Sequence, residues 1–234
     1  MIEAVFFDVG NTLMRDDPSV PYLFTSVARN LGHDVDVQDA ISFMPEVGRF
    51  YEQQYLIDGD FWCNHDRAVQ LWLDMYTMIA HACGIEHDIP ELAQAVYDAY
   101  LDPANWSMFP DADKCIKQLK STGLRLAIVS NWDATLENLI RSMGKLPYFD
   151  EVIASAAVGC RKPSTAIFEI ALERMDVSPE RVVHVGDLPE ADGAGASSAG
   201  ITPVIIDRVG RFPDCAYARV ESLTELPALI EEMN

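Results

Sequence analysis

The chain has 234 residues, and its 37 Asp and Glu against 17 Lys and Arg give a formal charge of −20. A surface this acidic repels phosphate backbones and anionic lipids, so we expect neither a nucleic acid nor a membrane as a partner. The five cysteines are scattered and form no Cys-x-x-Cys pair. That usage is typical of reduced thiols. Because there is also no signal-like amino terminus and no 18-residue apolar run, we expect a cytoplasmic protein.

The first element in chain order is a strand that ends at a carboxylate. Apart from Glu3, residues 2–7 form an apolar, β-branched and aromatic run that predicts a buried strand, and Asp8 follows it directly. The next residues, Gly10, Asn11 and Thr12, are typical of a sharp turn. Ligands of open α/β sheets bind at the carboxyl ends of the strands, so Asp8 is a candidate functional residue. Taken alone, an Asp at this place more often only caps a turn.

The stretch after this strand predicts helices throughout. Residues 66–82 place apolar side chains on one face at helical spacing before Gly84 ends the pattern, and residues 90–101 repeat it more briefly. The composition changes at the end of this stretch, because no lysine precedes Lys114. We therefore predict a helical insert after the first strand, over residues 16–105.

From Phe109 onward, helices and strands alternate along the chain. This alternation predicts an α/β fold of the doubly wound class, in which a parallel sheet is covered by helices on both faces. A closing helix is expected over residues 223–233. The other expected strands are residues 124–129, 151–154, 181–185 and 202–206, and the expected helices are residues 111–122, 133–143, 164–175 and 187–199.

Polar residues follow three of these strands, just as Asp8 follows the first one. Ser130 comes after the second strand, Lys162 after the short third strand, and Asp187 and Asp192 after the fourth. In order, the chain thus offers a carboxylate, a hydroxyl, a lysine and a paired carboxylate. Because the carboxyl ends of parallel strands meet at one edge of the sheet, these groups are expected to converge there.

In this order and at this spacing, the four segments resemble the four motifs of the haloacid dehalogenase (HAD) superfamily of hydrolases. The resemblance covers residues 1–15 and roughly 108–207. The strings Ser-Asn-Trp-Asp at 130–133 and His-Val-Gly-Asp at 184–187 look most like the branch with the Reg-2-like and HDHD-type phosphatase homologues. The resemblance implies a Rossmann-like catalytic core over residues 1–15 and 106–234, with the helical insert as a cap that closes over the active site.

The resemblance also implies roles for the carboxylates. Asp8 would be the nucleophile, because a carboxylate can split one hard displacement into two easier ones. Mg²⁺ prefers carboxylate and carbonyl oxygens, so its ligands would be Asp8, the main-chain carbonyl of Gly10 and Asp187, with Asp192 in or beside the first coordination sphere. The alternative is that Asp187 and Asp192 only cap the helix that follows them.

Lys162 would neutralise the clustered carboxylates and the group being transferred. We expect Pro163 to start the next helix and thereby to place this lysine at a helix amino terminus. A solvated surface lysine is the alternative, and Arg161 is as consistent with a surface charge as with a role in the site. Ser130 and Asn131 would donate hydrogen bonds to the oxyanion of the substrate.

Two further candidates lie at the expected substrate site. Thr12 is expected to orient the nucleophile loop, and Trp132 either forms a wall of the site or packs in the core. In the insert, Phe61, Trp62 and His65 could reach the substrate, although aromatic residues at such spacing more often belong to the core.

Gly10 departs from the family pattern. HAD phosphatases usually carry a second Asp two residues after the nucleophile, which protonates the leaving alcohol and later activates water. The dehalogenase and phosphonatase branches lack that Asp, as this chain does. The retained Asp187 favours metal-assisted phosphoryl chemistry over the metal-independent dehalogenase branch. The insert contains no lysine, with which a phosphonatase would form its Schiff base.

The leading prediction is a Mg²⁺-dependent phosphatase-like hydrolase, either a monomer or a homodimer. It would act on a small anionic phosphate ester through an aspartyl-phosphate intermediate. The first alternative is a metal-independent 2-haloacid dehalogenase. The second is a non-catalytic binding or regulatory protein that keeps the fold, and Gly10 is its main support.

Overall fold

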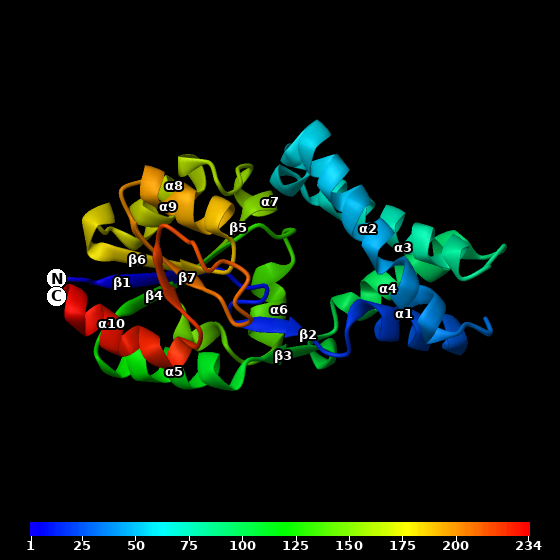
Figure 1. The fold of residues 1–234 in the computed structure, drawn as a ribbon, viewed down its shortest axis with the longest axis horizontal. Coiled ribbons are helices and arrows are strands. Elements are labelled where there is room, and N and C mark those ends of the chain that lie inside the picture. The colour runs from blue at the N-terminus through cyan, green and yellow to red at the C-terminus, as the bar shows by residue number, and fades with distance from the viewer.

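The computed structural model describes residues 1–234, except for the side chain of Asp58. A six-stranded sheet lies at the centre of the larger part of the molecule, in the order β5-β4-β1-β6-β7-β8 (Figure 1). Each neighbouring pair of these strands is parallel. The strands are β1 (Ala4–Phe7), β4 (Arg125–Ser130), β5 (Glu151–Ala154), β6 (Val182–Gly186), β7 (Thr202–Ile206) and β8 (Ala218–Val220).

Helices cover both faces of this sheet. Side chains alternate along β1, so that Phe6 packs on one face while Val5 and Phe7 pack on the other. Figure 1 shows α8 and α9 on one side of the sheet and α5 and α10 on the other. The predicted doubly wound α/β fold is thereby confirmed. The helices of this part are α5 (Pro110–Ser121), α6 (Leu136–Ser142), α7 (Ser155–Val158), α8 (Thr165–Met175), α9 (Gly195–Ser198) and α10 (Leu226–Met233).

Between β1 and β4 the chain leaves the sheet and forms a helical insert beyond the carboxyl edge of the strands (Figure 1). It leaves through β2 (Met14–Asp16) and returns through β3 (Trp106–Met108), which pair antiparallel. Alternation along the sequence did not predict these two short strands. In the described chain, no helix is long and apolar enough to cross a bilayer. The insert consists of α1 (Val20–Asn30), α2 (Val37–Asp58), η1 (Gly59–Cys63), α3 (His65–Ala82), α4 (Ile89–Tyr100) and η2 (Pro103–Asn105).

Aromatic rings join the insert to the sheet-bearing part at α4. The ring centroid of Tyr100 lies 4.9 Å from that of Trp106 and 6.0 Å from that of Trp132, which follows β4. The hydroxyl of Tyr97 donates a buried hydrogen bond of 3.1 Å to Oδ2 of Asp133. This side of the insert is therefore held by burial of large rings and by a satisfied buried carboxylate.

Two predicted helices begin later than expected. The helix expected from residue 133 starts at Leu136, because Oδ1 of the buried Asp133 accepts from the main-chain nitrogen of Thr135 at 2.8 Å and forms a turn first. The helix expected from residue 164 starts at Thr165, with Ser164 as its N-cap. Pro163 therefore precedes this helix instead of starting it, which corrects the placement of Lys162 at a helix amino terminus.

The predicted helix over residues 187–199 is wrong in form. The chain makes a wide π-type turn, η5 (Pro189–Ala194), and only then the short α9. One cause is that Oδ2 of Asp192 accepts from the main-chain nitrogen of Leu188 at 3.0 Å. The residue before the turn is thereby bound to a side chain from within the turn. The close packing of Gly195 against Pro163 is another constraint, since a Cβ on Gly195 would lie 3.0 Å from Cα of Pro163.

Candidate active site

The carboxyl edge of the sheet brings the predicted polar residues together. The chain runs from β1 outward through β4 to β5 and then crosses back to β6 on the other side of β1, and this reversal of strand order creates the switch point where α/β sheets bind ligands. Asp8 follows β1, and Asp187 follows β6. One carboxylate oxygen from each of Asp8, Asp187 and Asp192 lies within 4.8 Å of the others.

Asp8 is held mainly through one of its two oxygens. Oδ1 accepts from Nζ of Lys162 at 2.7 Å and from Oγ of Ser130 at 2.9 Å. Oδ2 has a long contact of 3.5 Å with Oγ1 of Thr12. The main-chain nitrogen of Asp8 donates to the carbonyl of Val185 on β6 at 2.8 Å. The carboxylate is therefore fixed in place, with Oδ2 as the less engaged oxygen.

Lys162 is 2% exposed and lies between two carboxylates. Its Nζ also donates to Oδ1 of Asp192 at 2.6 Å. Burial opposes the charge on this ammonium, but the charges of Asp192 and Asp8 outweigh burial and raise the pKa of Lys162 above its ordinary value. Nε2 of the fully buried His184 lies 2.9 Å from the same Asp192 oxygen. Burial lowers the pKa of His184, so its imidazole is neutral at pH 7.

Asp187 is the member of the cluster whose charge is least compensated. Burial, followed by the charges of Asp8 and Asp192, raises its pKa to about 7, although Arg211 opposes the shift. Nη2 of Arg211, a half-exposed side chain, donates to Oδ2 of Asp187 at 3.1 Å. Three carboxylates so close together, with oxygen donors only, suit a hard divalent cation. The residues present therefore fit a metal ion of the Mg²⁺ type.

Ser130 and Asn131 contact other site residues rather than open space. Ser130 donates to Asp8, as described above. Nδ2 of Asn131 donates to the carbonyl of Lys162 at 3.0 Å, and its Oδ1 accepts from the Lys162 main-chain nitrogen at 2.8 Å. The side-chain amide of Asn131 is thus engaged by the lysine loop, which differs from the donor role expected toward a substrate.

Thr12 and Trp132 are both buried, at 0% and 6% exposure. The ring of Trp132 packs on Trp106 at a centroid distance of 5.1 Å, which favours the packing interpretation over a wall of the site. Phe61 and Trp62 are likewise buried among the rings of the insert.

Two arginines that the sequence did not single out complete this region. Nε and Nη2 of Arg208 donate to the carbonyls of Asn11 and Thr12 at 3.2 and 2.9 Å, and its Nη1 donates to Asp111 at 2.8 Å. Arg208 thereby fixes the turn after the nucleophile, while Arg211 reaches Asp187. Both follow the predicted strand over residues 202–206, and this strand-end position is the signal in the sequence that points to them. His184 belongs to the string His-Val-Gly-Asp at 184–187, but the sequence pattern indicated no role for it.

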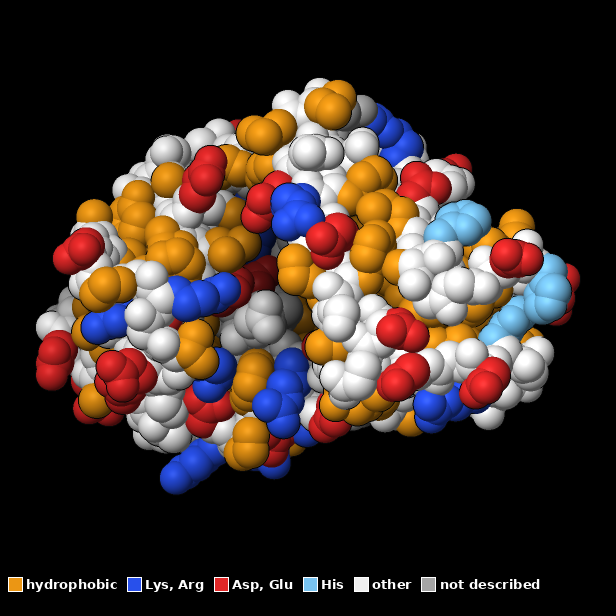
Figure 2. Space-filling model, turned by 45° about the vertical axis from the view of Figure 1, so that its right-hand side comes forward, with side chains coloured by type: hydrophobic (Ala, Val, Ile, Leu, Met, Phe, Trp, Pro, Cys, Tyr) orange, Lys and Arg blue, Asp and Glu red, His pale blue; other side chains and the backbone are white. Residues whose placement is uncertain are grey.

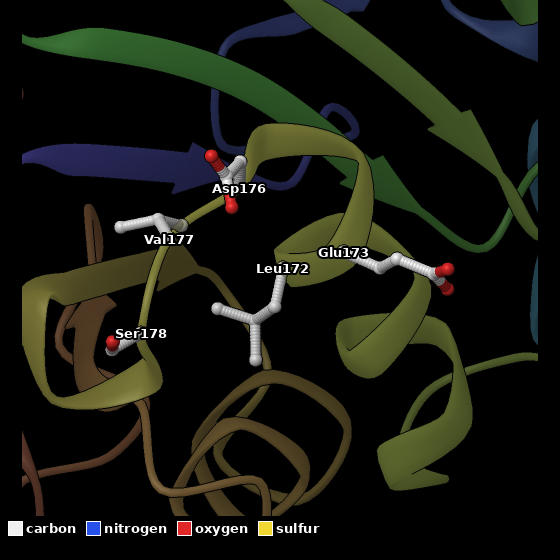
Figure 3. A pocket seen from close by; sticks show the side chains of 5 residues that line it. All are labelled: Leu172, Glu173, Asp176, Val177 and Ser178. Carbon is white, nitrogen blue, oxygen red and sulfur yellow. The ribbon is translucent and has the colours of Figure 1, made fainter.

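The surface is hollowed where the sheet-bearing part and the insert meet, with acidic and basic side chains around the hollow (Figure 2). A separate depression of about 360 Å³ is lined by Leu172, Glu173, Asp176, Val177 and Ser178 (Figure 3). It lies at the end of α8, where the chain returns toward the start of β6, and so at the opposite edge of the sheet from the carboxylates.

A family model of haloacid dehalogenase-like hydrolases matches residues 2–200 of the chain. The chain belongs to this family. The expected family and the expected class of enzyme, a hydrolase, are thereby confirmed.

Known relatives of this hydrolase include proteins named as phosphatases. It is 30% identical over 207 residues to haloacid dehalogenase-like hydrolase domain-containing protein 3 of Mus musculus, covering 86% of this chain and 80% of that protein. It is also 30% identical over 221 residues to a glyceraldehyde 3-phosphate phosphatase of Methanothermobacter thermautotrophicus, covering 88% of this chain and 86% of that protein.

Solved structures of both reaction classes share the fold of this hydrolase. A HAD phosphatase from Thermococcus onnurineus matches with a TM-score of 0.68 and 28% identity, over 98% of each chain. A 2-haloacid dehalogenase from Pseudomonas syringae matches with a TM-score of 0.69 and 24% identity, over all of both chains. Because the fold is common to both classes, the reaction has to be argued from the site.

Proposed function

We propose that this hydrolase is a Mg²⁺-dependent phosphatase that acts on small phosphate esters, with Asp8 as its nucleophile. The observation that carries the proposal is the placement of Asp8, which is held by Lys162 and Ser130 beside the carboxylates of Asp187 and Asp192. A fixed carboxylate next to a buried ammonium suits attack on an anionic, electrophilic centre.

The proposed metal ligands are Asp8, the main-chain carbonyl of Gly10 and Asp187. Asp192 would lie beside them, because both of its oxygens already accept hydrogen bonds, from Lys162 and from the main chain of Leu188. When bound, Mg²⁺ would neutralise charge on the transferring phosphoryl group. The choice of Mg²⁺ rests on the oxygen-only donor set and on the charge of Asp187, which the half-exposed Arg211 compensates only in part.

In the first step an oxygen of Asp8 attacks phosphorus, so that an Asp8 O–P bond forms while the bond to the leaving oxygen breaks, and the leaving oxygen takes its proton from water because Gly10 supplies no acid. Lys162 stabilises the negative charge, and Ser130 keeps the carboxylate aligned. Water then hydrolyses the aspartyl phosphate, releasing inorganic phosphate and restoring Asp8.

We propose small phosphorylated sugars as the first substrate class to test, because relatives are named for such substrates. The helical insert over residues 16–105 would act as the cap that covers the substrate, with the rest of the chain as the catalytic core. Its position beyond the carboxyl edge of the sheet supports this role. A cytoplasmic location is part of the proposal, and the five free thiols support it.

A screen of phosphate esters and 2-haloacids, run with Mg²⁺ and with EDTA, tests the proposal. We expect release of inorganic phosphate that requires the metal. Phosphate release that is equally fast in EDTA would contradict the metal dependence.

The second candidate is the metal-independent 2-haloacid dehalogenase, which Gly10 favours because that branch lacks an Asp there. Chloride release in EDTA, without phosphate release, would establish it.

Binding of a phosphate analogue such as vanadate, with no turnover of any ester or haloacid, would instead favour a non-catalytic binding protein.

A further inference from the structure

The insert meets the sheet-bearing part at a second place, away from α4. Its turn η1 packs against α7, which follows β5, and Figure 1 shows the end of α2 next to α7. From α7 the chain continues through Gly159 and Cys160 to Arg161 and Lys162. The segment that delivers Lys162 to Asp8 is therefore also a contact surface for the insert.

Arg161 makes this contact, and its side chain is 18% exposed. Its Nη1 donates both to the hydroxyl of Tyr55 on α2 at 2.6 Å and to the carbonyl of Lys162 at 3.0 Å. The guanidinium carbon lies 4.5 Å from the centroid of the Tyr55 ring, and Nε lies 3.7 Å from Oδ1 of Asp60. One guanidinium thus holds the insert and the main chain of Lys162 together.

The main chain of Lys162 is fixed at both of its polar groups. Asn131 binds its nitrogen and its carbonyl, and Arg161 supplies a second donor to that carbonyl. Because the Lys162 side chain is fully buried, its reach to Asp8 depends on where this main chain lies.

We propose that Arg161 is a positioning residue that couples the seating of the insert to the alignment of Lys162. With Tyr55 in place, Nη1 is fixed at the Lys162 carbonyl. When the insert moves away, Nη1 loses Tyr55 and its hold on that carbonyl loosens. A planar, multiply donating guanidinium suits this double contact, whereas an ammonium on a flexible stem does not. The consequence for catalysis rests on the proposed function, while the coupling itself does not.

Gly59 allows the contact to be disturbed without altering its partners. A Cβ on Gly59 would lie 2.1 Å from Nη2 of Arg161, so Gly59→Ala must push the guanidinium aside. The backbone at Gly59, with φ −60° and ψ −12°, accepts alanine without strain. Gly48 lies within α2, and a Cβ there has nothing within 4 Å. Gly48→Ala is therefore the matched control.

The first measurement is residue-resolved amide hydrogen exchange by NMR, without substrate. In Gly59→Ala and in Arg161→Ala, we expect the Lys162 amide and the amides of residues 59–63 to exchange about fivefold to tenfold faster, as for loss of one charge-assisted hydrogen bond. Arg161→Lys should lie between these variants and the wild type, and Gly48→Ala should leave both regions unchanged. The double variant Gly59→Ala/Arg161→Ala should match Arg161→Ala alone, because the two changes act on one contact.

The second measurement is steady-state kinetics on an aryl phosphate. In Gly59→Ala and in Arg161→Ala we expect kcat and kcat/KM to fall together by about tenfold, since a misplaced Lys162 stabilises the transition state less well. An unchanged exchange rate of the Lys162 amide in Arg161→Ala would overturn the coupling. The coupling would also be overturned if Gly59→Ala increased that rate as much in the Arg161→Ala protein as in the wild type. Failure of the wild type to hydrolyse any ester would reject the proposed function, and the exchange data would still decide the coupling.

Discussion

The six-membered ring of Trp132 lies over Gly10, so that a Cβ added to Gly10 would be 4.0 Å from Cζ3 of Trp132. That distance is an ordinary van der Waals contact, and Gly10 is not among the residues with positive φ. Glycine at this position is thus not imposed by the backbone, and the structure leaves room for the Cβ of a larger residue.

If the proposed function holds, the absent acid should make the rate sensitive to the leaving group. A positioned general acid contributes about 10² to 10⁴ in rate, so alkyl phosphates should be cleaved far more slowly than aryl phosphates. The measurement is kcat/KM of the wild type across esters of graded leaving-group pKa, with chemistry rate-limiting. A flat dependence would indicate that another residue already serves as the acid.

Gly10→Asp should raise activity toward alkyl phosphates, because the added Cβ fits beside Trp132 and its carboxyl supplies the acid that the chain lacks two residues after Asp8. We expect an increase of up to about 10²-fold for alkyl esters and little change for aryl esters. Gly10→Asn is the matched control, since it adds the same volume without an acid. Equal gains in the two variants would attribute the effect to packing and not to proton transfer.

Asp8→Asn should lower turnover by about 10³-fold or more, since the amide keeps the shape of the carboxylate and loses the nucleophile. The melting temperature should change little, because relief of the repulsion between Asp8 and Asp187 offsets loss of the ion pair between Asp8 and Lys162. Hydroxylamine trapping should detect an acyl phosphate in the wild type only. Wild-type turnover by a folded Asp8→Asn protein would reject covalent catalysis.

Mg²⁺ should raise both the activity and the melting temperature. At 100 times its dissociation constant, a ligand specific for the native state stabilises it by about 2.7 kcal/mol, or roughly 5–10 °C for a chain of this size. Asp187→Asn should remove most of this shift, while Asp98→Asn, which changes an exposed carboxylate on α4, should keep it. An equal thermal shift in the Asp187→Asn protein would place the metal elsewhere.

Asp207 should make the stability of the fold depend on acid pH. Burial alone would raise its pKa, but hydrogen bonds from the main chain of Phe212 and Arg211 and from Arg219 lower it to about 2. Because the pKa of Asp207 in the folded chain is below the unfolded value of about 3.9, its contribution to the free energy of unfolding is complete above about pH 4. That contribution is lost as the pH falls toward about 2. The urea midpoints of wild type and Asp207→Asn should therefore converge over that range. Asp214→Asn, which changes an exposed carboxylate in the same segment, is the matched control.

The fold was predictable because its determinants are local. Apolar runs such as residues 2–7 specify buried strands, and the alternation after Phe109 specifies a parallel sheet. The turn at Pro189–Ala194 was not predictable, because it depends on the carboxylate of Asp192 binding the main chain of Leu188. The strands β2, β3 and β8 (Ala218–Val220) were missed because each is only three residues long, which is too short for a periodic pattern to show.

The candidate site was predictable as a set of residues but not as a set of contacts. Strand-end position and family resemblance brought Asp8 and Lys162 into one hypothesis, although 154 residues separate them. The direction of a side chain depends on its tertiary neighbours, so the engagement of Asn131 by Lys162 could not be read from spacing. Arg208 was missed because a charged residue after the last expected strand is equally typical of a solvated loop.

The pairing of β2 with β3 sets Asp16 opposite Trp106, so the two ends of the helical insert lie next to each other. None of the six strands of the main sheet is interrupted by this excursion. A segment whose two ends adjoin can be replaced by another of different length with little effect on the framework that carries it. We therefore expect that grafting the corresponding helices of a relative between Asp16 and Trp106 would transfer substrate preference with the carboxylates still in place, as long as the graft keeps a tyrosine at the place of Tyr55 to hold Arg161.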